Sequence, residues 1–421
     1  MDRLPYRSAP RWWAPNLRPP FVRALRPYRI WRHQKRKERV VDVEVRGLEH
    51  LRGALINGCG VLIACKHVGH ADAFVMLAAG DELGVPFYYL VGWQVFELLS
   101  PFSRWVLRRH GAFSIDRESF DLRAFRKAVE LLRTSRHPLV VFAEGEVYHH
   151  GERVFPFRPG VAAIALKAAC QGNRPIVAVP TAIKYEYVED IAPRLAEVMT
   201  ALEQHLLWQP RPHLALSERL HRLAHGVLAM REMDHLGEVR TGAYATRLTE
   251  LSDTILERLE KRYGTRVRAE DVPSRVTHLR QLLIQQMEAL PPADARRGEY
   301  ERELEQLNVV IQLYSYQHDF DTDNASLERQ AEMVDKYEED VLGLPTARIR
   351  GARRAIVAFS EPIVVAKPVT RKADPQPLTE QLERRVQKLL DELHDKPAAI
   401  KGSSATTGLG IQDPKLTADS C

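Results

Sequence analysis

The chain has 421 residues, of which 45% are hydrophobic and 28% are charged. This composition describes a globular protein large enough for more than one core, and it excludes collagen-like, disordered and miniature disulfide-rich proteins. No run of residues is long and uncharged enough for a membrane-spanning helix, and the first residues lack the apolar core of a secretory signal, so we expect a cytoplasmic protein. The four cysteines include no C-x-x-C pair, which predicts reduced thiols and no structural zinc site: Cys59, Cys65, Cys170 and Cys421.

The net charge of +6 is concentrated at the N-terminus. Residues 1–40 contain 12 Lys or Arg and two acidic residues, so this arm carries +10 and the remainder of the chain −4. Aromatic residues lie among these cations, including Trp12, Trp13, Phe21, Tyr28 and Trp31. The combination suits an anionic membrane surface, but it also suits single-stranded nucleic acid or an arm that packs on its own domain. Among these open alternatives we favour peripheral attachment to the inner face of the membrane, and we expect no nucleic-acid partner.

After the arm, short strands and helices alternate along the chain. Residues 40–45 alternate between apolar and polar as a half-buried strand does, and residues 60–65 form a continuous apolar run typical of a buried strand. The same patterns predict further strands at 87–91, 113–115, 139–142 and 176–180, and helices at 71–79, 95–108 and 122–134. This alternation predicts an α/β fold with a central mixed sheet flanked by helices.

A long all-helical segment follows and then the strand pattern returns. Helical periodicity is found at 191–208, 213–233, 244–263, 276–288, 299–318 and 327–341, before a strand at 355–365 and a helix at 378–393. We therefore predict an α/β domain built from residues 41–187 and 353–397, interrupted by a helical insertion at 188–352. The polar stretch at 398–421 is predicted to be a disordered tail.

The first candidate site lies where the strand at 60–65 gives way to the next helix. His67 and Asp72 stand there in an H-x4-D arrangement. Residues five positions apart lie about 140° apart around an ideal helix, so both face one substrate only if His67 precedes the helix. In that geometry Asp72 accepts a hydrogen bond from one imidazole nitrogen and leaves the other nitrogen free as a base. We therefore predict that His67 and Asp72 are catalytic and activate a hydroxyl group.

The spacing alone is weak evidence. The chain has 16 histidines, and His318 and Asp323 repeat the spacing inside the helical segment, where a polar helix terminus explains it better. His70 lies between the first pair and raises the alternative of a metal site. The other available histidines, His110, His149 and His150, form no recognisable set of ligands, so we predict no metal and no cofactor.

Strand ends further along the chain supply candidate substrate-binding residues. Arg117 follows the strand at 113–115, and its planar guanidinium group suits a phosphate. Glu144 and Gly145 follow the strand at 139–142, where the glycine lets a ligand approach the backbone. Nearby cations complete the predicted substrate-binding set: Lys66, Arg153 and Arg158.

The order and spacing of these motifs resemble the glycerophospholipid acyltransferase family, whose best-known members are lysophosphatidic acid acyltransferases. That family carries the motifs N-H-x-S-x-x-D, G-x-x-F-I-D-R and F-P-E-G-T-R-S and a V-P strand. The matching positions here are His67, Asp72, Arg117, Glu144, Gly145 and Pro180. The resemblance covers about residues 43–185 and resumes at 355–393.

The resemblance implies transfer of a fatty acyl group from acyl-CoA or acyl carrier protein to a hydroxyl of a lysophospholipid or glycerol phosphate-type acceptor. It implies that His67 is the general base and that Asp72 fixes its tautomer, while backbone N–H groups of the following helix stabilise the oxyanion. The sequence departs from the motifs at Lys66, Gly69, Ala143, Glu146 and Val147. Because the carboxylate of Glu146 replaces a threonine and an arginine is lost, the pocket is expected to be less hospitable to phosphate, and a different lipid hydroxyl stays open as the acceptor.

A protein of a different class remains the alternative: a catalytically silent membrane-surface or nucleic-acid-binding protein on the same fold. The presence of both His67 and Asp72 favours the enzyme. For the insertion, a structural cap, a dimerisation surface and a dock for a carrier protein all stay open.

Overall fold

The computed structural model describes residues 10–118, 121–265, 271–291, 293–316, 325–367 and 373–395. Its centre is a sheet of eight strands in the order β1-β7-β6-β2-β5-β3-β4, with β8 paired to β6. The strands are β1 (Val40–Arg46), β2 (Gly60–Cys65), β3 (Tyr88–Gly92), β4 (Ala112–Ile115), β5 (Leu139–Phe142), β6 (Ile176–Tyr187), β7 (Arg353–Phe359) and β8 (Ile363–Val364). The predicted α/β fold with a mixed sheet is confirmed.

Strand direction decides where loops gather at the edges of this sheet. Strands β2 to β6 run parallel, whereas β7 runs antiparallel to β6 and β1 runs parallel to β7. All six residues of β2 are buried, as expected for a strand covered on both faces. The carboxyl ends of the five parallel strands meet at one edge, which is where ligands bind in open α/β sheets.

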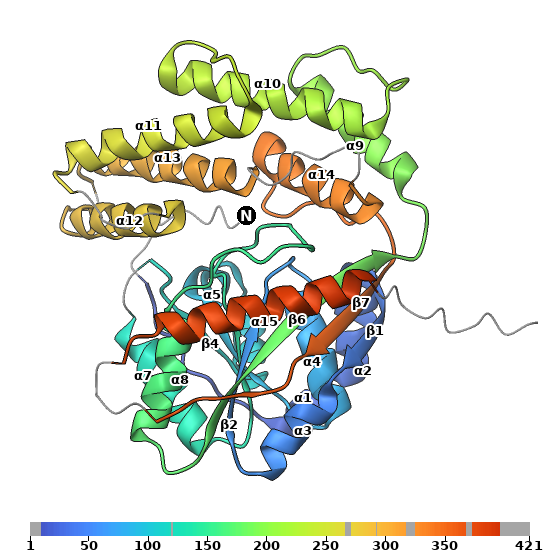
Figure 1. Ribbon diagram of the computed structural model, residues 1–421, viewed down its shortest axis with the longest axis vertical. Helices are drawn as coiled ribbons and strands as arrows, with labels where there is room; N and C mark the ends of the chain where they lie inside the picture. The colour runs from blue at the N-terminus through green and yellow to red at the C-terminus, as the bar shows by residue number, and fades with distance from the viewer. Residues whose placement is uncertain are drawn as a thin grey trace, which may run out of the picture.

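Helices cover both faces of the sheet (Figure 1). One face packs against α7 (Leu122–Thr134), α8 (Gly160–Gln171) and α15 (Gln376–Asp395), and the other packs against α3 (Leu48–Ile56) and α4 (Asp72–Leu83). Because successive residues of a strand point to opposite faces, the neighbours Leu62 and Ile63 of β2 belong to different hydrophobic clusters. The sheet is therefore the middle layer of three.

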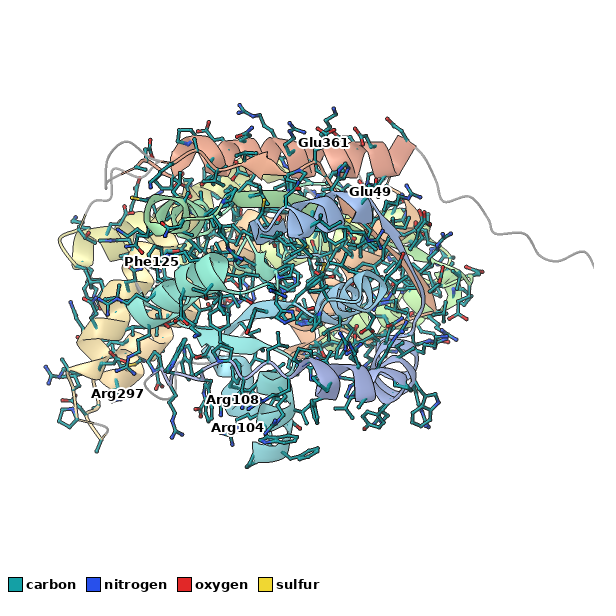
Figure 2. All side chains as sticks on the ribbon, turned by 90° about the horizontal axis from the view of Figure 1, so that it is seen from below. Glu49, Arg104, Arg108, Phe125, Arg297 and Glu361 are labelled. Carbon is teal, nitrogen blue, oxygen red and sulfur yellow. The ribbon has the colours of Figure 1, made fainter. Side chains whose placement is uncertain are left out.

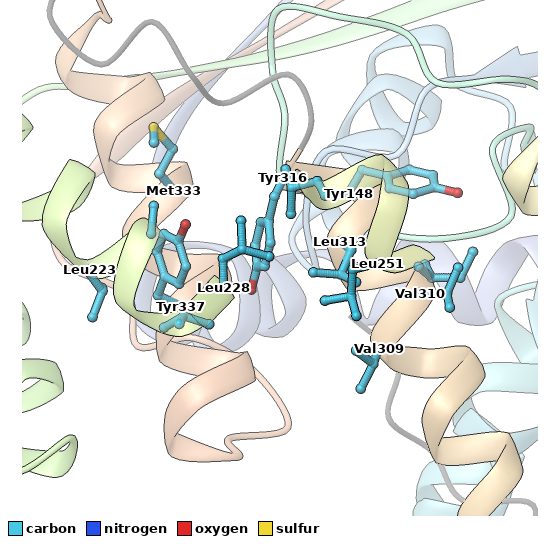
Figure 3. Packing of buried hydrophobic residues seen from close by; sticks show 14 of the residues in the cluster. Tyr148, Leu223, Leu228, Leu251, Val309, Val310, Leu313, Tyr316, Met333 and Tyr337 are labelled. Atoms are coloured by element: carbon cyan, nitrogen blue, oxygen red, sulfur yellow. The ribbon is translucent and has the colours of Figure 1, made fainter. Parts of the chain in front are cut away.

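Between β6 and β7 the described residues form six helices that lie over the carboxyl edge of the sheet (Figure 1). They are α9 (Ala192–His205), α10 (Leu216–Leu236), α11 (Tyr244–Arg262), α12 (Val272–Glu288), α13 (Arg297–Tyr316) and α14 (Leu327–Leu342). A hydrophobic cluster of their own holds them together, including Leu251, Leu313 and Tyr337 (Figure 3). Tyr148 and Phe155 also belong to this cluster, although they come from the loop between β5 and α8. That loop therefore fastens the helical insertion to the α/β body.

Residues 10–38 pack against the α/β body. They form α1 (Pro19–Ala24), α2 (Arg26–Tyr28) and the π-helix η1 (Arg29–Lys37). Trp13 stacks on Phe96 with 5.9 Å between ring centroids, and Arg29 forms an ion pair with the mostly buried carboxylate of Asp81. Part of the aromatic and basic content of this segment is therefore used within the protein, which was one of the three interpretations left open.

Two elements differ from the sequence-based expectation. The single helix predicted at 95–108 is divided into α5 (Trp93–Leu98) and α6 (Pro101–Arg109), because Ser100 caps a new helix that opens with proline. The last predicted strand is likewise divided into β7 and β8, with Pro362 between them, since proline cannot donate to a strand ladder.

Some expectations fall on parts of the chain about which the structure gives no description. The tail at 398–421 and the second H-x4-D pair, His318 and Asp323, lie outside the described residues. Within the described residues, no helix has both the length and the apolar character needed to cross a membrane.

Candidate active site

His67 lies in the loop between β2 and α4, at the carboxyl edge of the sheet. Its Nδ1 is 2.8 Å from Oδ2 of Asp72, the first residue of α4. The imidazole ring stacks on Phe142 at the end of β5, with 4.3 Å between ring centroids. The side chain remains partly exposed and lines a pocket. His67 thus precedes the helix, and its Nε2 is the nitrogen left for a substrate proton.

Asp72 is completely buried and accepts four hydrogen bonds. Besides His67, its Oδ2 accepts from the backbone N–H groups of Val68 at 2.7 Å and Gly69 at 3.1 Å, while its Oδ1 accepts from the hydroxyl of Tyr185 at 2.6 Å. Burial, together with the nearby Asp72 charge, raises the pKa of Tyr185, so the phenol stays a donor. Because a carboxylate oxygen accepts the bond from the ring, the contact assigns the Nδ1–H tautomer to His67.

Two expectations change with this arrangement. The N–H groups of Val68 and Gly69, which precede α4, are engaged by Asp72, so an oxyanion site would need other donors. Sequence reasoning also missed Tyr185, which comes from β6 and is far from Asp72 in the chain. Its position five residues beyond Pro180, on a strand next to β2, was the available signal.

Lys66 and Glu144 form a buried ion pair behind the pocket. Lys66 Nζ is 3.2 Å from Glu144 Oε1, and neither side chain is exposed. Glu144 also accepts hydrogen bonds from the backbone N–H groups of His67 at 2.9 Å and Phe155 at 2.8 Å, and Lys66 donates to the carbonyl of Arg153. Neither side chain lines the pocket. The two residues expected to bind substrate therefore lie behind the pocket, where Glu144 holds the loop that carries His67.

Arg117 and Arg158 do line the pocket and contact each other's loops. Arg117 Nη1 donates to the carbonyl of Gly145 at 2.7 Å, and Arg158 Nη1 donates to the carbonyl of Arg117 at 2.7 Å. Arg158 crosses directly over Gly145, where a Cβ atom would lie 2.3 Å from Arg158 Nε. Gly145 also has a φ of +74°, so only glycine fits this position without strain. Arg153, the other predicted cation, is exposed and does not line this pocket.

Glu146 was expected to repel a phosphate, but it lies among three guanidinium groups. Its carboxylate is 3.9 Å from Arg117, 3.7 Å from Arg158 and 3.5 Å from Arg280. The third arginine belongs to α12, and no sequence pattern linked the insertion to this site. The pKa of Glu118 is lowered, because the charges of Arg280, Arg158 and Arg117 outweigh the opposite effect of burial. The carboxylate of Glu146 is therefore paired with arginines, while Asp116 and Asp121 line the pocket together with Arg117 and Arg158.

A largely apolar pocket of about 490 Å³ connects His67 with these arginines. Its apolar lining comes from β3, β4, β5, α7 and α8: Leu90, Ile115, Phe125, Val141, Val161 and Ile164. Thr277 and Gln281 of α12 contribute to the wall from the side of the insertion. Among the roles left open for the insertion, this position favours a cap over the pocket.

One comparison with known proteins bears on this site. Residues 42–184 match the model of the family described as Acyltransferase, in agreement with the resemblance seen in the sequence. The match begins in β1 and ends in β6, before the insertion. A comparison with curated proteins gives no match. The matched domain supports acyl transfer as the general function.

Proposed function

We propose that this chain, whose residues 42–184 match the model of the family described as Acyltransferase, moves a fatty acyl group from acyl-CoA or acyl carrier protein to a hydroxyl of a lysophospholipid or glycerol phosphate-type acceptor. One observation carries the proposal: His67, apolar walls and the two arginines Arg117 and Arg158 meet in a single pocket. Apolar walls suit an acyl chain, and guanidinium groups suit a phosphate.

The reaction follows from the orientation of the imidazole. His67 Nε2 accepts the proton of the acceptor hydroxyl while the hydroxyl oxygen attacks the thioester carbonyl carbon. The C–S bond then breaks, and the imidazolium returns the proton to the departing thiolate, so an ester and a free thiol are formed. Asp72 stabilises the imidazolium through the hydrogen bond to Nδ1. These reaction steps use two side chains of the protein, the base His67 and its partner Asp72.

Thiol release from an acyl-CoA, measured with and without lysophosphatidic acid, tests the proposed reaction. We expect release that depends on the acceptor and forms a diacylated product visible by mass spectrometry. Acyl carrier protein thioesters and neutral or amine-bearing lyso-lipids form the comparison panel. If no acceptor in the panel stimulates thiol release or becomes acylated, the proposed reaction is wrong and the catalytically silent alternative is favoured.

Arg158→Met is expected to raise the KM for a phosphorylated acceptor by about tenfold or more, with a smaller change in kcat. A charge-assisted hydrogen bond contributes about 1.5–3 kcal/mol, and this guanidinium group lines the pocket beside Gly145. Arg153→Met is the matched control, because Arg153 lies in the same loop but does not line the pocket. Equal KM values for the two variants, measured by steady-state kinetics, would remove Arg158 from acceptor binding.

We also propose peripheral attachment to an anionic membrane surface, which would let a lipid acceptor enter from the bilayer. The α5–α6 hairpin supports this, because Leu98 and Phe102 are each 71% exposed. Arg104 and Arg108 lie on the same helix as Phe102 (Figure 2). Trp105 is also exposed, and Arg109 lies over its ring at 4.2 Å. Exposed apolar side chains flanked by arginines are typical of a helix that lies in the interface.

Leu98→Ser combined with Phe102→Ser is expected to lower recovery of the protein with anionic liposomes in a flotation assay. These substitutions remove apolar area available to the bilayer while leaving the arginines and the fold's core in place. Leu207→Ser is the control, since Leu207 is 95% exposed but lies in the insertion. If the double variant floats as well as this control, the α5–α6 hairpin is not the attachment surface.

A further inference from the structure

His70 lies between the catalytic pair in sequence but meets the helical insertion in space. Its Nε2 is 3.6 Å from Oε1 of Glu339 on α14. His149, from the loop between β5 and α8, brings its own Nε2 to 3.2 Å from the same oxygen. One possible ligand atom from each of the three residues lies within 4.8 Å of the others. Three segments that are distant in the chain thus converge on one point.

Both Nε2 atoms face the Glu339 carboxylate at ion-pair distance, but neither makes a well-aligned hydrogen bond, although His149 is only 6% exposed. A buried polar nitrogen is normally well hydrogen-bonded. Two imidazole nitrogens and one carboxylate are a common set of ligands for zinc.

The distances suit such an ion. With ligand bonds of about 2.0–2.2 Å, neighbouring ligand atoms of a tetrahedral zinc site lie about 3.3–3.5 Å apart. The two observed separations from Glu339 Oε1 bracket this value. The backbone N–H of Ala347 donates to the same oxygen at 2.9 Å and thereby orients the carboxylate.

A cavity of about 220 Å³ adjoins the cluster and is lined by both histidines together with Glu332 and Asp335. It has ample room for a water molecule as a fourth ligand, which three-ligand zinc sites normally carry.

The geometry points to a binding site for a zinc-class divalent cation formed by His70, His149 and Glu339. The ion ties α14 of the insertion to the loop that holds His67 and to the loop between β5 and α8. Sequence reasoning predicted no metal because it considered His70 with other histidines and with Asp72, whereas the carboxylate ligand comes from the far end of the insertion. The inference is independent of acyl transfer, since binding of zinc is measured without any substrate.

The test uses the full chain, purified without a histidine tag, stripped with a chelator and titrated with Zn²⁺ against a competing metal indicator. We expect one Zn²⁺ per chain, and a visible Co²⁺ absorption of tetrahedral intensity after substitution with Co²⁺. His149→Gln and Glu339→Gln are each expected to weaken binding at least about 100-fold, because loss of a ligand exceeds the effect of losing an outer partner. His150→Gln is the matched control, because His150 is equally buried but stands outside the cluster.

A second measurement covers the case in which a variant fails to fold. Zn²⁺ is expected to raise the Tm of the stripped wild-type protein progressively with the logarithm of its concentration, whereas Mg²⁺ at equal concentration is not expected to raise it. The inference is overturned if the wild type shows neither stoichiometric Zn²⁺ binding nor a Zn²⁺-dependent rise in Tm. It is also overturned if the folded His149→Gln and Glu339→Gln variants bind Zn²⁺ as tightly as His150→Gln.

Discussion

His67→Ala is expected to lower the kcat of acyl transfer by about 10²- to 10⁴-fold, the usual contribution of a positioned general base. The hydrogen bond from Nδ1 to Asp72 leaves Nε2 as the free nitrogen, and the ring is held in place by stacking on Phe142. His70 also lines the pocket, but its Nε2 faces Glu339 of the insertion at 3.6 Å, so it is not positioned as His67 is. Steady-state thiol release with saturating acyl donor and acceptor measures the loss.

His137→Ala is the matched control for this variant. His137 is partly buried and precedes β5, so it lies at the opposite edge of the sheet from His67. It makes a hydrogen bond to the carbonyl of Pro86, and its loss is expected to affect stability without removing a proton acceptor from the pocket. If His67→Ala retains the kcat of His137→Ala, the role assigned to His67 is wrong.

Lys66→Met is expected to lower the free energy of unfolding by about 3–5 kcal/mol, the usual cost of breaking a buried ion pair by removing one partner. The carboxylate of Glu144 would then remain buried without its ammonium partner. Glu144 also accepts hydrogen bonds from the backbone of His67 and Phe155, so the damage would reach the catalytic loop. Urea unfolding measures the change as a lower midpoint.

Two further variants isolate the ion pair. Lys66→Met combined with Glu144→Gln is expected to cost less than the sum of the single changes, because the unpaired charge is gone. Lys127→Met is the control, since its ion pair with Glu130 is exposed and contributes at most about 1 kcal/mol. If Lys66→Met destabilises the protein no more than Lys127→Met does, the pair does not brace the site.

The fold and the contact between His67 and Asp72 were predictable because their signals are local. A run of apolar residues indicates a strand buried on both faces, and β2 lies where that pattern placed it. The H-x4-D spacing, combined with helix geometry, required His67 to precede the helix, and α4 begins at Asp72. Strands that alternate with helices run parallel, so the residues that follow them lie at one edge of the sheet.

The roles of the charged residues were not predictable in the same way. Lys66 and Glu144 follow strand ends just as Arg117 does, yet they are buried against each other whereas Arg117 lines the pocket. Position in a motif does not say whether a side chain faces solvent or a neighbouring loop. The surroundings of Glu146 depended on Arg280, which the insertion brings from more than a hundred residues away.

The amino-acid order by itself determined the mixed sheet, the helical character of the insertion and the placement of the imidazole and its carboxylate, because each depends on periodicity or spacing over a few residues. Only the tertiary structure decided that α12 completes the pocket wall and that Glu339 meets His70 and His149. These contacts join segments separated by long stretches of chain, and their distances are set by how the insertion packs over the sheet edge. No local pattern encodes that packing, because the energy that fixes it comes from a hydrophobic cluster shared between the insertion and the loop after β5.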